Sequence, residues 1–186
     1  MKDLKARTWE EMERGIKNLL QEVFSEHKYL IKELDEFDLS ILKKIINKEV
    51  ELEGLKSSLK FLTKILYEKY NKKVVVLIDE YDAPLVSAYH NKYYEKAKDF
   101  FKTFYSSVLK DNVYLQMGVM TGIIRVIKAG IFSDLNNLNT YTILSDFYPN
   151  CYGLTEEEVK KTLIDYNLEY EMGDVKDWYD GYKFGK

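Results

Sequence analysis

The apolar residues near the start of the chain repeat with the period of an α-helix. Beginning at Trp9, they recur at every third or fourth position as far as Val23, which predicts one amphipathic helix that ends near Glu26. Thr8 and Glu11 make the pattern of a capping box at its start, because the hydroxyl and the carboxylate each bind a backbone N–H that the first turn leaves unpaired.

The helical period continues and then changes abruptly. A short helix is expected over Leu39–Ile46, and a longer one runs from Leu52 to about Tyr70. At Val74–Ile78 five aliphatic residues follow one another without alternation, which is typical of a parallel strand buried on both faces. Helices are therefore expected on both sides of this strand.

A second strand is predicted beyond the next helix. Tyr94–Val108 places aromatic and apolar side chains on one helical face, and the apolar run "YLQMGVM" then ends at Thr121 and Gly122. A third, shorter strand is predicted in "NTYTIL", residues 139–144. Helices that alternate with apolar strands predict an α/β fold of three layers, in which helices flank a largely parallel sheet.

Acidic residues stand at the end of the first strand. Val74–Ile78 runs directly into Asp79, Glu80 and Asp82, and carboxylates gathered in this way repel one another unless a cation, a reacting water or hydrogen bonds stabilise them. Ligands of parallel sheets bind at the carboxyl ends of the strands. We therefore expect Asp79, Glu80 and Thr121 to lie together at that edge.

An aliphatic strand followed by Asp-Glu has the form of a Walker B motif. In that motif the first acid, here Asp79, positions Mg²⁺, and the second, here Glu80, polarises the water that attacks the γ-phosphate. Thr121 is placed to touch the same phosphate or water, and Arg125 to supply positive charge to the transferred group.

Each of these residues also has a purely structural interpretation. Aliphatic strands that end in acidic loops are common, and Thr-Gly is ordinary turn chemistry. Arg125 alone fits a solvated surface charge, and Asp82 fits a cap on the segment that follows it.

Composition limits the classes of function. The 186 residues contain 28 Lys and Arg against 31 Asp and Glu, so no overall basic field drives nonspecific nucleic-acid binding. Whether nucleic acid is recognised by other means stays open. Cys151 is the single cysteine, and the N-terminal residues lack the apolar core of a signal peptide. A cytoplasmic protein that does not span a membrane is expected.

Four blocks of sequence resemble the AAA-ATPase-like family of P-loop proteins. They are "VVVLIDEYDAPL", "TGIIRVIKAGIFSDLNNL", "YGLTEEEVK" and "WYDGYKFG", and the likeness begins at "LKARTWEEM". The resemblance implies ATP and Mg²⁺ as cofactors of the intact protein, with Asp79 as the metal-associated acid, Glu80 as general base, and Thr121 and Arg125 in a sensor block. Family members often carry a C-terminal nuclease-like domain of the PD-(D/E)xK type.

The chain departs from the family at the phosphate-binding loop. Gly-x-x-x-x-Gly-Lys-Ser/Thr is absent from it, although the amides and lysine of that loop hold the phosphates. We therefore expect residues 1–150 to form a partial core that lacks the phosphate-loop strand, and residues 151–186 to be a helical extension. No nucleotide is expected to bind this chain alone, and Met1 is expected to follow a truncation or to begin a degenerate homologue.

A missing central strand leaves a sheet edge to be covered. The remaining strands close together, a second copy pairs across the edge, or the piece is unstable. The preferred interpretation is a fragment of an ATPase that is inactive by itself, and the alternative is a noncatalytic interaction module derived from that fold. A metal-dependent nuclease using Asp79 and Glu80 is the weakest alternative, because no strand lysine accompanies a second acid at suitable spacing.

Overall fold

The computed structural model describes residues 1–123, 138–151, 153–168 and 172–179. The chain divides into two compact units, Met1–Asn136 and Asn137–Lys186. Because compactness alone defines these units, the predicted division between a partial core (1–150) and a helical extension (151–186) stays a prediction.

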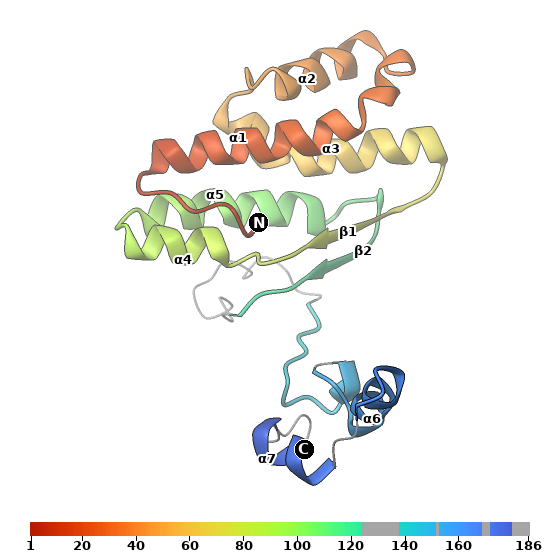
Figure 1. Ribbon diagram of the computed structural model, residues 1–186. Helices are drawn as coiled ribbons and strands as arrows, with labels where there is room; N and C mark the ends of the chain where they lie inside the picture. Colours follow the sequence, from red (N-terminus) through yellow and green to blue (C-terminus); the bar gives the residue numbers. More distant parts are fainter. Residues whose placement is uncertain (124–137, 152, 169–171, 180–186) are drawn as a thin grey trace. The chain divides into compact units, whose positions relative to one another are not determined.

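The first unit contains most of the regular structure (Figure 1). Its elements in chain order are α1 (Trp9–Glu26), the 3₁₀ helix η1 (Lys28–Lys32), α2 (Glu36–Ile46), α3 (Leu52–Tyr70), β1 (Val74–Ile78), α4 (Ala83–His90), α5 (Tyr94–Leu109) and β2 (Leu115–Met120). The predicted helices and both predicted long strands are confirmed. The short helix α4 was not singled out from the sequence.

Local hydrogen bonds fix where the first helices begin. The Thr8 hydroxyl accepts the N–H of Glu11 at 3.3 Å, and the Glu11 carboxylate reaches back to the N–H of Arg7 at 2.9 Å. Helix α2 begins before the predicted Leu39, because the Asp35 carboxylate accepts the N–H of Asp38 at 2.8 Å and so caps an earlier first turn.

The helices of the first unit lie in successive layers over one face of the sheet. Helices α3 and α5 pack against each other and contact β1 and β2, while α1 packs on α3 and α2 packs on α1. Figure 1 shows all of these helices on the same side of the two strands. Ring contacts between Trp9 and Phe100 and between Phe24 and Phe61 join α1 to α5 and to α3.

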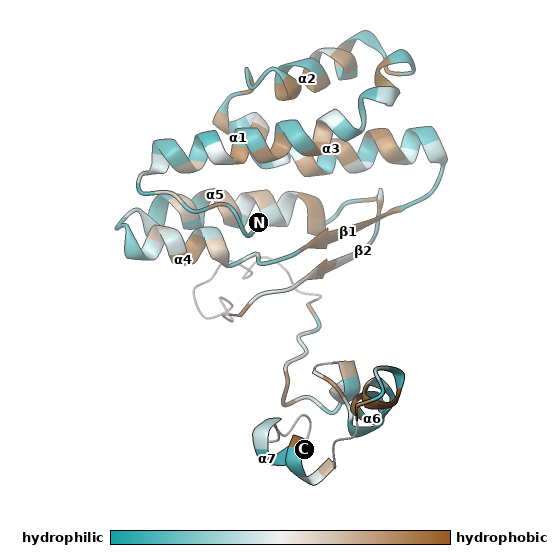
Figure 2. Cartoon of the chain, viewed as in Figure 1, coloured by the Kyte–Doolittle hydropathy of each residue, from teal (hydrophilic) through white to brown (hydrophobic). Residues whose placement is uncertain are grey.

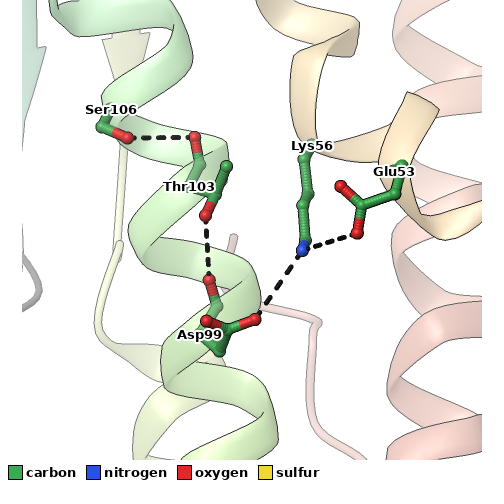
Figure 3. Close-up of polar contacts among 5 residues, drawn as sticks. All are labelled: Glu53, Lys56, Asp99, Thr103 and Ser106. Atoms are coloured by element: carbon green, nitrogen blue, oxygen red, sulfur yellow. Dashed lines mark hydrogen bonds and ion pairs between the residues drawn. The ribbon is translucent and has the colours of Figure 1, made fainter.

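An ion pair joins α3 to α5 at the side of this core (Figure 3). Lys56 contacts Glu53 of its own helix at 2.9 Å and Asp99 of α5 at 3.7 Å. The Asp99 carbonyl accepts the Thr103 hydroxyl at 3.2 Å, and the Thr103 carbonyl accepts the Ser106 hydroxyl at the same distance. Partly exposed ion pairs of this kind stabilise a fold only slightly.

The two strands pair in parallel, with Ile78 opposite Met120 at their ends. The helix-facing Ile78 is buried, whereas Leu77 is 74% exposed and its neighbours Val75, Met117 and Val119 are exposed as well. Figure 2 shows the strands coloured as apolar. In the described part of the chain helices therefore cover one face of the sheet, and the third layer of the predicted fold is not formed there.

The second unit contains the 3₁₀ helix η3 (Pro149–Cys151) and the helices α6 (Glu156–Asp165) and α7 (Met172–Tyr179). Helix α6 begins with the predicted capping box: the Thr155 hydroxyl accepts the N–H of Glu158 at 3.3 Å, and the Glu158 carboxylate accepts the N–H of Thr155 at 2.7 Å. In the ranges that the structure describes, no helix is both long and apolar enough to cross a membrane.

The predicted third strand over residues 139–144 is wrong, because residues 139–142 have no regular structure and residues 143–144 lie in a turn. The N–H of Thr142 donates to the Ser145 hydroxyl at 2.9 Å, and the N–H of Ser145 donates to the Thr142 carbonyl at 2.9 Å. Side chains of Ser and Thr that bind nearby backbone groups compete with strand pairing, and here the local bonds prevail over the β-branched composition.

Candidate active site at the strand ends

The backbone departs from regular pairing immediately after β1. In a regular parallel pair, one residue binds two residues of the neighbouring strand that lie two positions apart. The N–H of Thr121 binds the carbonyl of Ile78 at 2.9 Å, but its carbonyl binds the N–H of Tyr81, three positions on, at 3.0 Å. One extra residue is therefore inserted, as in a β-bulge, and Asp79 and Glu80 occupy the bulge.

Glu80 has the left-handed backbone conformation, with φ of 50°. This region costs a non-glycine residue about 1–2 kcal/mol. Five of the six other described non-glycine residues with positive φ lie just after the end of a helix, where such a conformation is common: Lys48, Asn71, Lys92, Asp111 and Asn167. The sixth, Tyr148, directly precedes η3. Glu80 instead follows a strand, in the bulge, and unfavourable backbone conformations of this kind cluster at functional sites.

Asp79 is held by hydrogen bonds to one of its carboxylate oxygens. The Thr121 hydroxyl and the N–H of Glu80, the latter at 3.0 Å, both donate to Oδ1. The hydrogen bond from Thr121 is the main reason that the pKa of Asp79 lies below its usual value, and the Glu80 N–H adds to it. The predicted proximity of Asp79 and Thr121 at the carboxyl ends of adjacent strands is confirmed.

The residues present fit a water-rich Mg²⁺ site better than a cage of protein ligands. Mg²⁺ keeps several waters and is bound by one or two carboxylates together with substrate phosphates. Asp79 is exposed, and its second oxygen, Oδ2, accepts no hydrogen bond from the described residues. Over those same residues, no group of three or more potential metal-ligating side chains is found.

Asp82 has a different environment from Asp79 and Glu80. It is 4% exposed, and its Oδ2 accepts the N–H of Ile123 at 3.1 Å. Its side chain makes no capping hydrogen bond to α4, although it stands at the N-cap position, so the capping interpretation is wrong. Sequence reasoning missed its link to the end of β2, and the only available signal was its place in the acidic cluster.

Comparison with known proteins identifies the family of the chain. The model of a family described as "Predicted AAA-ATPase" matches residues 1–132. The chain belongs to this predicted AAA-ATPase family. The family expected from the sequence is thereby confirmed, and the match includes Asp79, Glu80 and Thr121, while the blocks "YGLTEEEVK" and "WYDGYKFG" lie beyond the matched residues.

One relative of this AAA-ATPase family protein is an uncharacterized protein in the vnfD 5' region of Azotobacter chroococcum mcd 1. It is 26% identical over 114 residues, which cover 61% of this chain and 22% of the relative. The aligned part is thus about a fifth of that protein. No solved structure matches the chain significantly.

Arg125, predicted from its place after Thr121 to supply positive charge to the transferred phosphoryl group, lies outside the described residues. The catalytic roles of Glu80 and Thr121 and the metal-binding role of Asp79 stay predictions.

Proposed function

We propose that the edge formed by Asp79, Glu80 and Thr121 is the acidic half of a site for Mg²⁺-dependent ATP hydrolysis in the intact protein. The strongest support is the bulge, because it leaves Asp79 and Glu80 outside the backbone pairing of the two strands. The bulge lies at the carboxyl ends of the strands, where α/β proteins bind ligands. Membership of the predicted AAA-ATPase family supports ATP as the substrate.

Each residue has a distinct role in this proposal. Asp79 would hold Mg²⁺, which when bound would offset the charge of the phosphates. Glu80 accepts a proton from the water whose oxygen bonds to the γ-phosphorus while the bond to the ADP oxygen breaks. Thr121 keeps Asp79 ionised and oriented, and Arg125 supplies positive charge to the transferred group.

The chain alone is proposed to be inactive as an ATPase. Its 186 residues contain no Walker A sequence, and the amides and lysine of such a loop supply most of the contacts to the β- and γ-phosphates. We also propose that the complete three-layer P-loop core forms only in the intact protein.

A version extended to include a Walker A loop tests the catalytic roles. Glu80→Gln keeps the shape of the side chain but removes the base, so turnover should fall at least about a hundredfold while Mg·ATP binding stays within a few fold. Asp79→Asn should instead weaken the dependence of binding on Mg²⁺. Glu157→Gln, on α6, is the matched control. Unchanged turnover in Glu80→Gln would remove this residue from the mechanism.

The alternative of a noncatalytic interaction module is favoured by one observation. Leu77 is 74% exposed on a sheet face that also exposes Val75, Met117 and Val119, and parallel sheets are ordinarily covered on both faces. In this proposal a second copy covers the open edge and face. Sedimentation over a range of concentrations tests it, since Leu77→Lys should abolish any self-association that the unmodified chain shows.

A further inference from the structure

The segments that follow β1 and β2 remain hydrogen-bonded to each other beyond the ends of the strands. After the last backbone pairing, between Tyr81 and Thr121, the N–H of Ile123 donates to Oδ2 of Asp82 at 3.1 Å. Ile123 itself is 95% exposed, so apolar burial does not hold its backbone in place. The buried carboxylate of Asp82 does so instead.

Gly122 lies unusually close to the segment after β1. A Cβ atom at this position would be 2.7 Å from Oδ1 of Asp82 and 2.7 Å from the Tyr81 ring, both shorter than real Cβ contacts. The absence of a side chain at Gly122 therefore permits the two segments to approach. Asp82, in the segment after β1, and Gly122, in the segment after β2, therefore both act on the place where these two segments meet.

Tyr81 joins this junction to the core. Its carbonyl accepts the hydroxyl of Tyr105 at 2.8 Å, and the Tyr105 side chain, from α5, is fully buried. The two rings also meet edge to face, with centroids 6.4 Å apart. The segment after β1 is thus anchored in the core, and Asp82 ties the segment after β2 to it.

We propose that Asp82 and Gly122 are positioning residues that hold the Thr121 hydroxyl against the carboxylate of Asp79. Thr121 is tied on one side by its backbone bonds to Ile78 and Tyr81, and on the other by the bond between Ile123 and Asp82. Without the second tie, the chain after Thr121 has fewer constraints and the side-chain contact to Asp79 loosens. The importance of this contact for catalysis rests on the proposed function, but the contact itself does not.

A double-mutant cycle on the full chain tests the proposal by NMR at neutral pH. The readouts are the Asp79 Cγ and Glu80 N–H resonances, because both groups report on Oδ1 of Asp79. Thr121→Val and Asp82→Ala should each shift these resonances in the same direction. In the Thr121→Val background, Asp82→Ala should add no further shift, because the contact through which it acts is already lost.

Two further variants separate positioning from general stability. Asp82→Asn retains an oxygen that accepts the Ile123 N–H, so it should keep the resonances of the unmodified chain. Gly122→Ala should reproduce the shifts of Asp82→Ala by forcing the segments apart. Hydrogen exchange at the Thr121 and Ile123 amides should become about tenfold faster in Asp82→Ala, while the amides of α1, such as that of Leu20, should be unchanged.

The proposal would be overturned if Asp82→Ala shifted the resonances equally in the presence and in the absence of Thr121→Val. It would also be overturned if Asp82→Ala caused no shift in the chain that retains Thr121. If Asp82→Ala prevents folding, Gly122→Ala replaces it in the cycle with Thr121→Val, and the same two outcomes would overturn the proposal. None of these readouts requires a nucleotide. If the cycle succeeds and the extended protein does not hydrolyse ATP, the proposed function fails and the positioning role remains.

Discussion

The hydroxyl of Thr121 donates a hydrogen bond to Oδ1 of Asp79, and so joins the first residues after two neighbouring parallel strands. The bond favours the ionised carboxylate and is the main cause of the lowered pKa of Asp79. A carboxylate that stays charged at all physiological pH values suits a residue proposed to bind Mg²⁺.

Replacing this hydroxyl should raise the pKa of Asp79. Thr121→Val removes the donor with little change in shape, so the carboxyl should titrate closer to its ordinary value of about 3.9, whereas Thr121→Ser should stay near the unmodified chain. The measurement is a ¹³C titration of the Asp79 carboxyl in the three proteins. An unchanged titration in Thr121→Val would show that the side-chain bond does not form in solution.

The hydrogen bond between Thr121 and Asp79 also determines how the stability of the fold changes with pH. The pKa of Asp79 is lower in the folded state than in the unfolded state. The ionised carboxylate therefore contributes fully to the stability of the fold above the unfolded-state pKa, and this contribution is lost as the pH falls through the folded-state pKa. Thr121→Val should therefore lose less stability between neutral and acid pH than the unmodified chain. Urea unfolding at several pH values compares the two, and Thr121→Ser is the control.

The partly buried ion pair between α2 and α3 predicts a larger effect on the free energy of unfolding. Lys64 contacts Asp38 at 2.7 Å, and the Asp38 side chain is only 4% exposed. Lys64→Met strands a buried carboxylate and should lower the free energy of unfolding by about 1–3 kcal/mol. Lys60→Met, on the same helix and without an ion pair in the described part of the chain, should change it by less than about 0.5 kcal/mol.

Urea denaturation followed by circular dichroism measures both values. Asp38→Asn combined with Lys64→Met should recover part of the loss, because the charge that needs a partner is gone. Equal unfolding free energies for the two lysine variants would contradict the prediction.

Patterns formed by residues close together in the sequence predicted most of the helices and both strands of the first unit correctly. The period of the apolar residues placed α1 and α3, and the aliphatic run placed β1. The expected burial of β1 on both faces is not found, since Leu77 is 74% exposed. The proximity of Asp79 and Thr121 followed from a general rule about parallel sheets.

Features set by hydrogen-bond geometry could not be predicted. The bulge depends on which N–H the Thr121 carbonyl selects, and the tie from Asp82 depends on a backbone group 41 positions away in sequence. For residues 139–144 the sequence predicted a strand that does not form. Their composition favours a strand, but hydrogen bonds between Thr142 and Ser145 form a turn.

The capping box of α6 predicts a second, local pH effect. The backbone N–H of Thr155 is the main cause of the lowered pKa of Glu158, and the Thr155 hydroxyl adds to it. Thr155→Ala should raise this pKa in part, since the backbone donor remains, and should fray the first turn of the helix. The depressed pKa means that the capping contribution is lost as the pH falls through the folded-state value.

Carbon-13 titration of the Glu158 carboxyl and the Cα shifts of the first turn of α6 measure the two effects. Glu157→Gln alters a neighbouring acid outside the box and should leave the first turn intact. A first turn that is equally ordered in Thr155→Ala would mean that the capping box does not stabilise α6.

The last prediction concerns ATP itself: this chain alone should bind Mg·ATP more weakly than about 1 mM, a binding free energy of only about 4 kcal/mol. The donors that most strongly bind the β- and γ-phosphates, a loop of amides with a lysine at a helix N-terminus, are absent from its sequence. The described edge offers Asp79 and Glu80, whose negative charges repel a polyanion unless Mg²⁺ intervenes, and a metal held by so few carboxylates is weakly bound. Calorimetric titration with Mg·ATP, compared with Asp79→Asn, measures the affinity. A micromolar dissociation constant that Asp79→Asn abolishes would show that another part of the chain supplies the phosphate contacts, and the proposed division between an acidic half and a separate phosphate-binding half would then be wrong.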